Sequence, residues 1–107
     1  MTYSAPGSSI NEVIDPTLFH TSGTYVGNAA SGSHTCGFQP RLIIVAADVT
    51  TSSRNGGIKN ASLASNAAIA TSGGATTGIT ITSTGFMVDA GAQFNYTGVN
   101  YYFNAFK

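Results

Sequence analysis

The regular recurrence of turn-forming residues is the feature that most limits what this chain can fold into. From residue 23 onward, turn-forming residues interrupt the sequence every ten or so residues. They occur at Gly23, 27–33, Gln39-Pro40, Asn55-Gly56-Gly57, Ser72-Gly73-Gly74, Ser83-Thr84-Gly85 and 89–92. The intervening segments are short and rich in Ile, Val, Thr, Tyr and Phe, which are residues that favour strands. This pattern predicts an all-β domain, built as an antiparallel β-sandwich or jelly roll.

The strand patterns differ between segments. The C-terminal segment alternates: Val99, Tyr101, Phe103 and Ala105 share one face, and Asn100, Tyr102, Asn104 and Phe106 share the other. Residues 41–47 instead form a nearly continuous apolar run, which predicts a strand covered on both faces. Residues 58–70 combine alanines with Ser and Asn and lack charged i,i+4 pairs, so we expect an irregular strand or loop there rather than a helix.

The scarcity of charge narrows the range of partners. Only 7% of the 107 residues are Lys, Arg, Asp or Glu, and their formal charges sum to zero. A nucleic-acid-binding surface needs clustered Lys and Arg, and the four basic residues here are scattered singly, so we expect neither nucleic acid nor a membrane as partner. A nearly neutral surface gives little repulsion between copies. We therefore expect much of it to be covered by other subunits, as in an assembly component.

The first 17 residues differ from the rest of the chain. Prolines, glycine and serines interrupt any period, and the larger side chains stand apart, at Tyr3, Ile10, Val13, Ile14 and Leu18. Such a segment cannot form a core of its own, but it can lie extended on a neighbour and bury those side chains. We therefore predict an extended N-terminal arm over residues 1–17 and a β-sandwich domain over residues 18–107. The alternative is a frayed terminus.

No residue pattern predicts catalysis or a cofactor. Neither histidine lies in a nucleophile motif, and the four acidic residues include no close pair on a predicted strand. His34 and Cys36, two residues apart on a strand, would share a face and could give two zinc ligands, with His20 as a third. A structural zinc site normally has four ligands, so a packed Cys36 and a hydrogen-bonded His34 are the favoured interpretation. In a symmetric trimer, His20 or His34 could still meet its copies near the axis.

The tyrosines near the C-terminus are candidates for contact with another molecule. Tyr96, Tyr101 and Tyr102 could together form an exposed aromatic patch, and tyrosine is favoured at interfaces. The alternation of the last strand places Tyr101 on the apolar face and Tyr102 on the mixed face. Tyr102 is therefore the stronger interface candidate.

Three stretches resemble a small β-sandwich module that is common in virion proteins of tailed phages and prophages. They are Gly23-Thr-Tyr-Val-Gly-Asn28, Gly37-Phe-Gln-Pro-Arg-Leu-Ile-Ile-Val45, and Ile79-Thr-Ile-Thr-Ser-Thr-Gly-Phe-Met-Val88 paired with Gly98-Val-Asn-Tyr-Tyr-Phe-Asn-Ala-Phe106. Together they span residues 20–107. In that family the module forms the distal part of tail fibres or decorates particles. It usually ends a long fibre chain, whereas here it follows a short arm, which favours a free-standing virion protein.

The resemblance implies a virion protein. The lack of a catalytic pattern predicts that it is not an enzyme, and the first residues show no signal-peptide pattern, so we expect synthesis in the host cytoplasm. Our first hypothesis is a capsid decoration (cement) protein, bound on the outer capsid surface as a symmetric oligomer, most simply a trimer, with the major capsid protein as its partner. The arm would lie across neighbouring capsid subunits or swap between protomers. The second hypothesis is a tail-fibre or tail-tip receptor-binding domain that contacts the host through two predicted loops, around residues 28–33 and 89–96. A third is an unrelated cytoplasmic β-domain.

Overall fold

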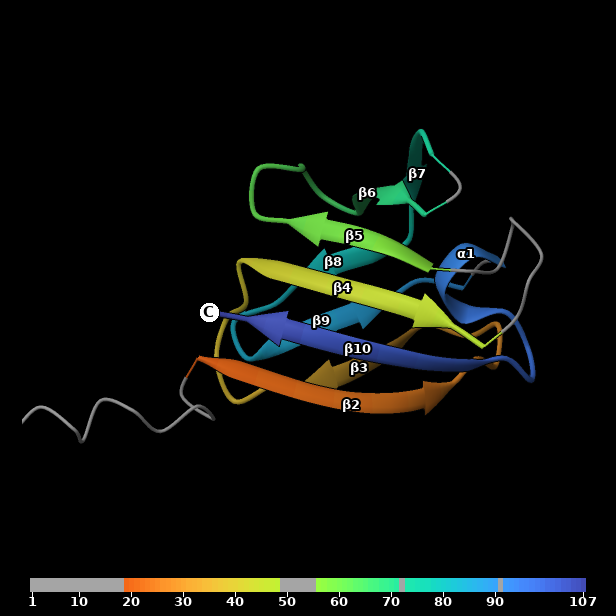
Figure 1. Ribbon diagram of the computed structural model, residues 1–107, viewed down its shortest axis with the longest axis horizontal. Coiled ribbons are helices and arrows are strands. Elements are labelled where there is room, and N and C mark those ends of the chain that lie inside the picture. The colour runs from red at the N-terminus through yellow and green to blue at the C-terminus, as the bar shows by residue number, and fades with distance from the viewer. Residues whose placement is uncertain (1–18, 49–55, 72, 91) are drawn as a thin grey trace, which may run out of the picture.

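The strands follow one another with short connections. The computed structural model describes residues 19–48, 56–71, 73–90 and 92–107 (Figure 1). The elements are β2 (His20–Val26), β3 (Gly32–Thr35), β4 (Leu42–Ala47), β5 (Gly56–Asn60), β6 (Ala67–Ala70), β7 (Ala75–Thr77), β8 (Ile79–Ile81), β9 (Gly85–Val88), the single-turn helix α1 (Ala92–Asn95) and β10 (Asn100–Phe106). In these ranges, no helix is long and apolar enough to cross a lipid bilayer.

The strands form two antiparallel sheets, which confirms the all-β sandwich prediction. The larger sheet has the order β2-β10-β4-β5-β6-β7, and the smaller one has the order β3-β9-β8. In Figure 1 the larger sheet lies in front of the smaller one, and the C-terminus lies beside the start of β2. The C-terminal strand β10 therefore pairs on both sides, with β2 and with β4.

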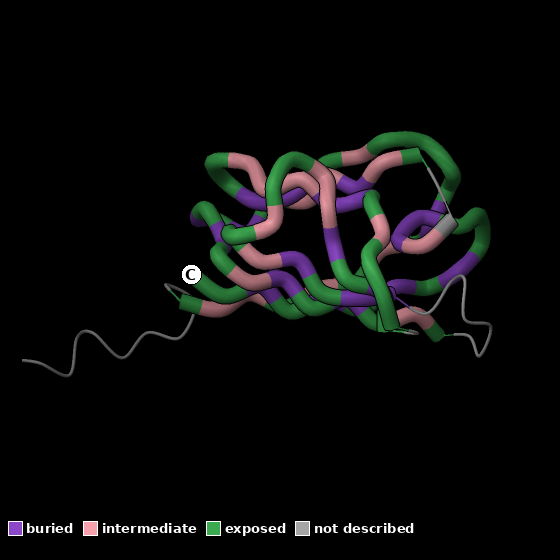
Figure 2. The backbone as a smooth tube through the Cα atoms, turned by 90° about the horizontal axis from the view of Figure 1, so that it is seen from above, coloured by how far each residue is buried: buried purple, intermediate pink, exposed green. Residues whose placement is uncertain are grey.

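The core lies between the two sheets and follows the period-two pattern of the strands. Tyr101, Phe103 and Ala105 of β10 point inward and are buried, while the residues between them are exposed, as the sequence predicts. Figure 2 shows the same alternation of buried and exposed residues along the chain. Phe86 of β9 meets Phe103 edge to face, with ring centroids 5.0 Å apart, and so joins the two sheets. Gly23 leaves room for the Phe103 ring, because a Cβ there would come within 2.8 Å of it.

Three local predictions are corrected by the structure. Residues 58–70 hold the end of β5, a turn and the whole of β6, rather than one irregular segment. The polar stretch 28–33 is a loop only to residue 31, because β3 begins at Gly32. Gly56 has the positive φ that the turn prediction requires, 90°, but it opens β5 instead of preceding it. These boundaries depend on which backbone groups pair between strands, and the amino-acid composition of a segment does not show that pairing.

Candidate interaction surface

One face of the six-stranded sheet points away from the smaller sheet, and we call it the outer face. It consists of every second residue of each strand, counted from His20 in β2, Leu42 in β4, Gly56 in β5, Ala67 in β6, Ala75 in β7 and Asn100 in β10. None of these residues is Lys, Arg, Asp or Glu. Because the cores of protein interfaces are depleted of charge, the outer face has the composition of an interface.

Three isoleucines form a continuous row across the outer face. Ile44 lies directly opposite Ile58, and Ile58 lies directly opposite Ile69. Their side chains are 38%, 39% and 41% exposed, respectively. Residues directly opposite on paired strands have Cβ atoms about 5 Å apart, so the three form one contiguous apolar patch. Patches of this kind mark interaction sites more often than isolated exposed residues do.

Aromatic side chains extend this patch towards β2. Tyr102 lies opposite Thr24 on one side and Ala46 on the other, and it is 47% exposed. Tyr102 is therefore available for contact, as its strand face predicts. Phe106 is also exposed on this face, where the His20 ring stacks on it with centroids 4.8 Å apart. Exposed aromatic rings with few rotatable bonds are favoured anchors at interfaces.

The outer face overturns the prediction that β4 is covered on both sides. Ile43 and Val45 are fully buried between the sheets, but Ile44 lies on the outer face, which no described element covers. The continuous apolar run has the composition of a strand with two protein-covered faces. Within the part of the chain that the structure describes, only one of those faces is covered.

The two loops of the receptor-binding hypothesis lie together at one end of the sandwich. The Asn95 side chain, 2% exposed, accepts a hydrogen bond from the Asn28 backbone amide at 3.0 Å and donates to the carbonyls of Ala30 (2.6 Å) and Asp89 (3.2 Å). The backbone amide of Ala29 donates to the carbonyl of Asn95 at 2.9 Å. One buried asparagine therefore ties residues 28–30 to the segment that follows β9. The sequence signals the loops but not this connection.

His20 and His34 lie on opposite sides of the larger sheet. His20 is on the outer face, where its Nε2 is 2.9 Å from Oδ1 of Asn104. His34 is inside the sandwich, stacked on Tyr25 at 4.3 Å and tilted against Phe86 at 5.2 Å. The described residues contain no group of three His, Cys, Asp or Glu side chains that could hold a metal ion. The zinc set of His20, His34 and Cys36 is not brought together in the part of the chain that the structure describes.

The aromatic surroundings of His34 predict acid sensitivity. Burial lowers the pKa of His34 below its usual 6.5, and burial raises the pKa of its neighbour Tyr25, which stays a neutral phenol. The unfolded chain then binds a proton at a higher pH than the folded chain, so stability is complete above about pH 6.5 and falls as the pH drops towards the folded-state pKa. We expect the melting temperature of the wild type to decrease from pH 7 to pH 5 more steeply than that of His34→Gln. Thermal melts at both pH values test this. Parallel slopes for wild type and His34→Gln would refute the prediction.

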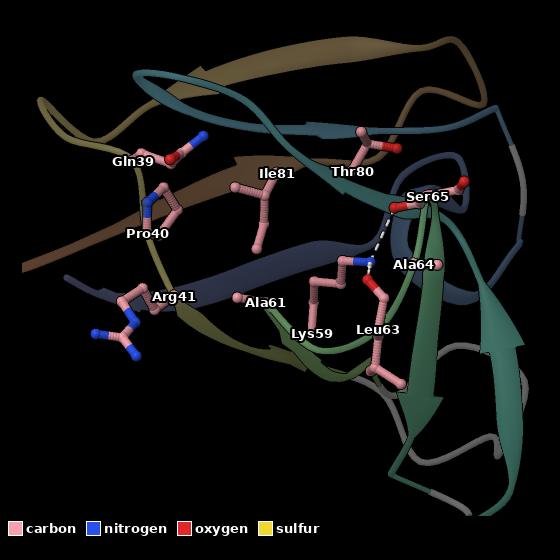
Figure 3. A pocket seen from close by; sticks show the side chains of 10 residues that line it. All are labelled: Gln39, Pro40, Arg41, Lys59, Ala61, Leu63, Ala64, Ser65, Thr80 and Ile81. Atoms are coloured by element: carbon pink, nitrogen blue, oxygen red, sulfur yellow. Dashed lines mark hydrogen bonds between the residues drawn. The ribbon is translucent and has the colours of Figure 1, made fainter.

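A pocket opens at the end of the sandwich opposite the Asn95 loops. It has a volume of about 390 Å³ and lies between residues 39–41, the turn at 61–65 and β8 (Figure 3). Lys59 lies at its inner side, with a side chain only 1% exposed. Its ammonium group donates to the carbonyl oxygens of Leu63 at 2.7 Å and of Ser65 and Ala67 at 2.8 Å. Burial lowers the pKa of Lys59.

Sequence reasoning did not identify Lys59 or the isoleucine row. A lone lysine in a polar, strand-forming segment is typical of a solvent-facing position. The row joins residues from three strands, and only the register brings them together. The arm residues proposed as interface, Tyr3, Ile10, Val13, Ile14 and Leu18, lie outside the described residues.

Comparisons with known proteins do not place the chain in a family. Scans of protein-family models and searches of curated proteins and of solved structures gave no match. A functional interpretation therefore depends on the geometry above and on the sequence resemblance.

Proposed function

We propose that this chain is a virion structural protein, a capsid decoration (cement) protein that binds the outer shell through the outer face of its six-stranded sheet. The observation that carries the proposal is the uncharged apolar patch of Ile44, Ile58 and Ile69, extended by Tyr102. The resemblance to phage virion modules supports the virion location. In this proposal the protein is not an enzyme, assembles as a homotrimer, and has the major capsid protein as its partner.

The size of the outer face is consistent with a shell-binding role in which the outer face and the arm each supply part of the contact. Six strands about 4.8 Å apart, with about five residues each at about 3.3 Å, give a face of roughly 400 Å². A standard protein interface buries about 800 Å² on each partner. The outer face can therefore supply part of a stable contact, and we assign a further part to the arm, whose Ile10, Val13 and Ile14 would lie across neighbouring shell subunits.

Binding to assembled shells would stabilise them without any chemistry. A ligand that binds only the assembled state shifts the equilibrium towards that state by mass action. Such a protein needs a large, uncharged contact surface and no catalytic group. The outer face supports this role because its apolar side chains gain from burial, while it carries no charge that would have to be desolvated.

Charge placed at the centre of the outer face tests the proposal. We expect Ile58→Lys to weaken binding to purified shells by at least about 30-fold, since an unpaired charge buried in an interface costs about 2 kcal/mol or more. Ser83→Lys adds the same charge in the exposed turn between β8 and β9 and should bind as the wild type does. Sedimentation of labelled protein with shells gives both affinities, with circular dichroism to show that each variant is folded. Equal binding by Ile58→Lys and wild type would refute the role of the outer face.

The alternative of a receptor-binding domain is favoured by a different observation, the two loops that Asn95 holds together at one end. Loops fixed on a rigid sandwich are a common way to present a recognition site. The two proposals differ in copy number. Quantitative mass spectrometry of purified particles should find this chain at a ratio close to that of the major capsid protein if it decorates the shell. A handful of copies per particle would support the tail location instead.

A further inference from the structure

The pocket beside Lys59 lies close to the point where the N-terminal arm joins the sandwich. Phe19 accepts a hydrogen bond from the Lys107 amide at 2.9 Å, and Arg41, on the pocket wall, donates its backbone amide to Phe106 at 2.7 Å. The next link is from the Ala61 amide to the carbonyl of Arg41 at 3.0 Å. A continuous set of backbone hydrogen bonds therefore runs from the root of the arm to the pocket. All these residues are at the end of the sandwich where β2 begins and β10 ends (Figure 1).

The pocket has an apolar interior and a basic rim. Leu63 and Ile81 contribute apolar surface, and the almost fully buried Pro40 and Lys59 form the wall behind them. Figure 3 shows the Arg41 guanidinium at the edge, directed outward from the cavity. An occupant that matches this arrangement has aliphatic side chains for the interior and a carboxylate for the rim.

The positive charge at this end has no described counter-charge. Neither Arg41 nor Lys59 pairs with a carboxylate among the described residues. The two acids in the described ranges are placed elsewhere. The Asp48 amide bonds to Asn100 at the start of β10, and the Asp89 carboxylate accepts from Asn66 at 2.7 Å. The other two acids of the chain, Glu12 and Asp15, belong to the arm.

The arm has the composition that the pocket requires. The stretch Ile10-Asn-Glu-Val-Ile-Asp15 contains three aliphatic residues, two acids and no basic residue. The arm is also long enough. From β2 the pocket is two to three strand spacings away, about 10–14 Å, and four extended residues span about 13 Å. Asp15 lies four residues before Phe19.

We propose that, in the free protein, residues 10–15 occupy this pocket of their own chain. Aliphatic side chains of the stretch fill the apolar interior, and Glu12 or Asp15 pairs with Arg41 at the rim. Attachment through a short linker gives the stretch an effective concentration in the millimolar range, which favours the same chain over a neighbouring copy. The pocket is then a resting site for the arm before it contacts any partner. This inference does not depend on capsid binding and can be tested on the isolated protein.

Backbone relaxation of the full ¹⁵N-labelled chain tests whether the stretch is held. We expect order parameters for residues 10–15 near 0.85, the value of rigid backbone, whereas an undocked stretch would give values below 0.6. In a full chain with Val13→Ser and Ile14→Ser, those values should fall below 0.6. The amide resonances of Ala61, Leu63 and Ile81 should shift while the rest of the sandwich spectrum stays unchanged. Tyr3→Ser, elsewhere in the arm, is the matched control and should move none of the three. Low order parameters in the wild type, or unmoved pocket resonances in the double variant, would overturn the proposal.

A second measurement distinguishes the same chain from a neighbour. A nitroxide attached at Asn11→Cys in a Cys36→Ala background should broaden the pocket resonances of its own ¹⁵N-labelled chain. In a second sample, a ¹⁵N-labelled chain without nitroxide is mixed with an equal amount of a nitroxide-carrying chain without ¹⁵N. The pocket resonances of the ¹⁵N-labelled chain should then show no broadening. Broadening in the mixed sample would show exchange of arms between copies and overturn the assignment to the same chain. Neither experiment involves a shell, so failure of the capsid proposal would leave this inference standing, and the reverse is also true.

Discussion

Replacement of Lys59 by methionine is expected to lower the free energy of unfolding by about 3 kcal/mol, which for a domain of this size lowers the melting temperature by roughly 15 °C. Methionine keeps most of the apolar stem but leaves the carbonyl oxygens of Leu63, Ser65 and Ala67 without their shared donor. A hydrogen bond from a charged group contributes about 1.5–3 kcal/mol, and the acceptors left behind lose solvation as well. Chemical denaturation followed by tyrosine fluorescence measures the change.

The turn that Lys59 holds is itself strained, which adds to the expected effect. Ser65 has a φ of 50°, in the left-handed region that residues with a side chain seldom adopt. The ammonium bond to the Ser65 carbonyl stabilises this conformation. Lys107→Met removes an equal charge at an exposed position and should change stability by less than about 0.5 kcal/mol. A Lys59→Met protein as stable as the wild type would show that water satisfies the three carbonyls equally well.

Truncation of Phe86 to alanine should destabilise the domain by about 3–5 kcal/mol, the usual range for a fully buried phenylalanine. Phe86 is 0% exposed, faces His34 across the smaller sheet and meets Phe103 of the larger sheet edge to face. Its removal leaves a cavity between the sheets and also ends two aromatic contacts. Equilibrium unfolding in urea gives the change, and a domain of this size with so large a loss is expected to be partly unfolded near 37 °C.

Phe106→Ala is the matched control for Phe86→Ala, because it makes the same substitution on the outer face. Phe106 is 36% exposed and contacts the His20 ring, so we expect a loss below about 1 kcal/mol. For binding to shells we expect the opposite order of effects. Phe106→Ala should weaken binding, whereas a core variant that stays folded should bind as the wild type does. Similar losses of stability at the two positions would mean that the outer face is covered in the isolated protein.

Some features of this protein could be predicted from sequence because they depend on local chemistry. The turn residues and the period of two define strands without reference to the rest of the chain, and so the all-β class and the two faces of β10 were predicted from residues near each other in sequence. The burial of Tyr101 and the exposure of Tyr102 follow from the same alternation.

The candidate interaction surface could be predicted only in part. The low charge content indicates an uncharged surface, but the row of Ile44, Ile58 and Ile69 joins strands that are separated by loops of different length. A shift of register by one residue would turn each isoleucine to the other face. The cover of β4 could not be predicted either, because an apolar run does not show whether another layer of protein lies on each face of the strand.

Most of the strand-forming segments, the turns and the low charge could be read from residues and their near neighbours in the chain. The positions of Lys59, His20 and His34, and the exposure of one face of β4, follow from the tertiary structure alone. It placed Lys59 inside, where three carbonyl oxygens stabilise its charge, and separated His20 from His34 by the thickness of a sheet. These outcomes depend on long-range strand pairing, in which free energy is gained only when segments distant in sequence meet in one register.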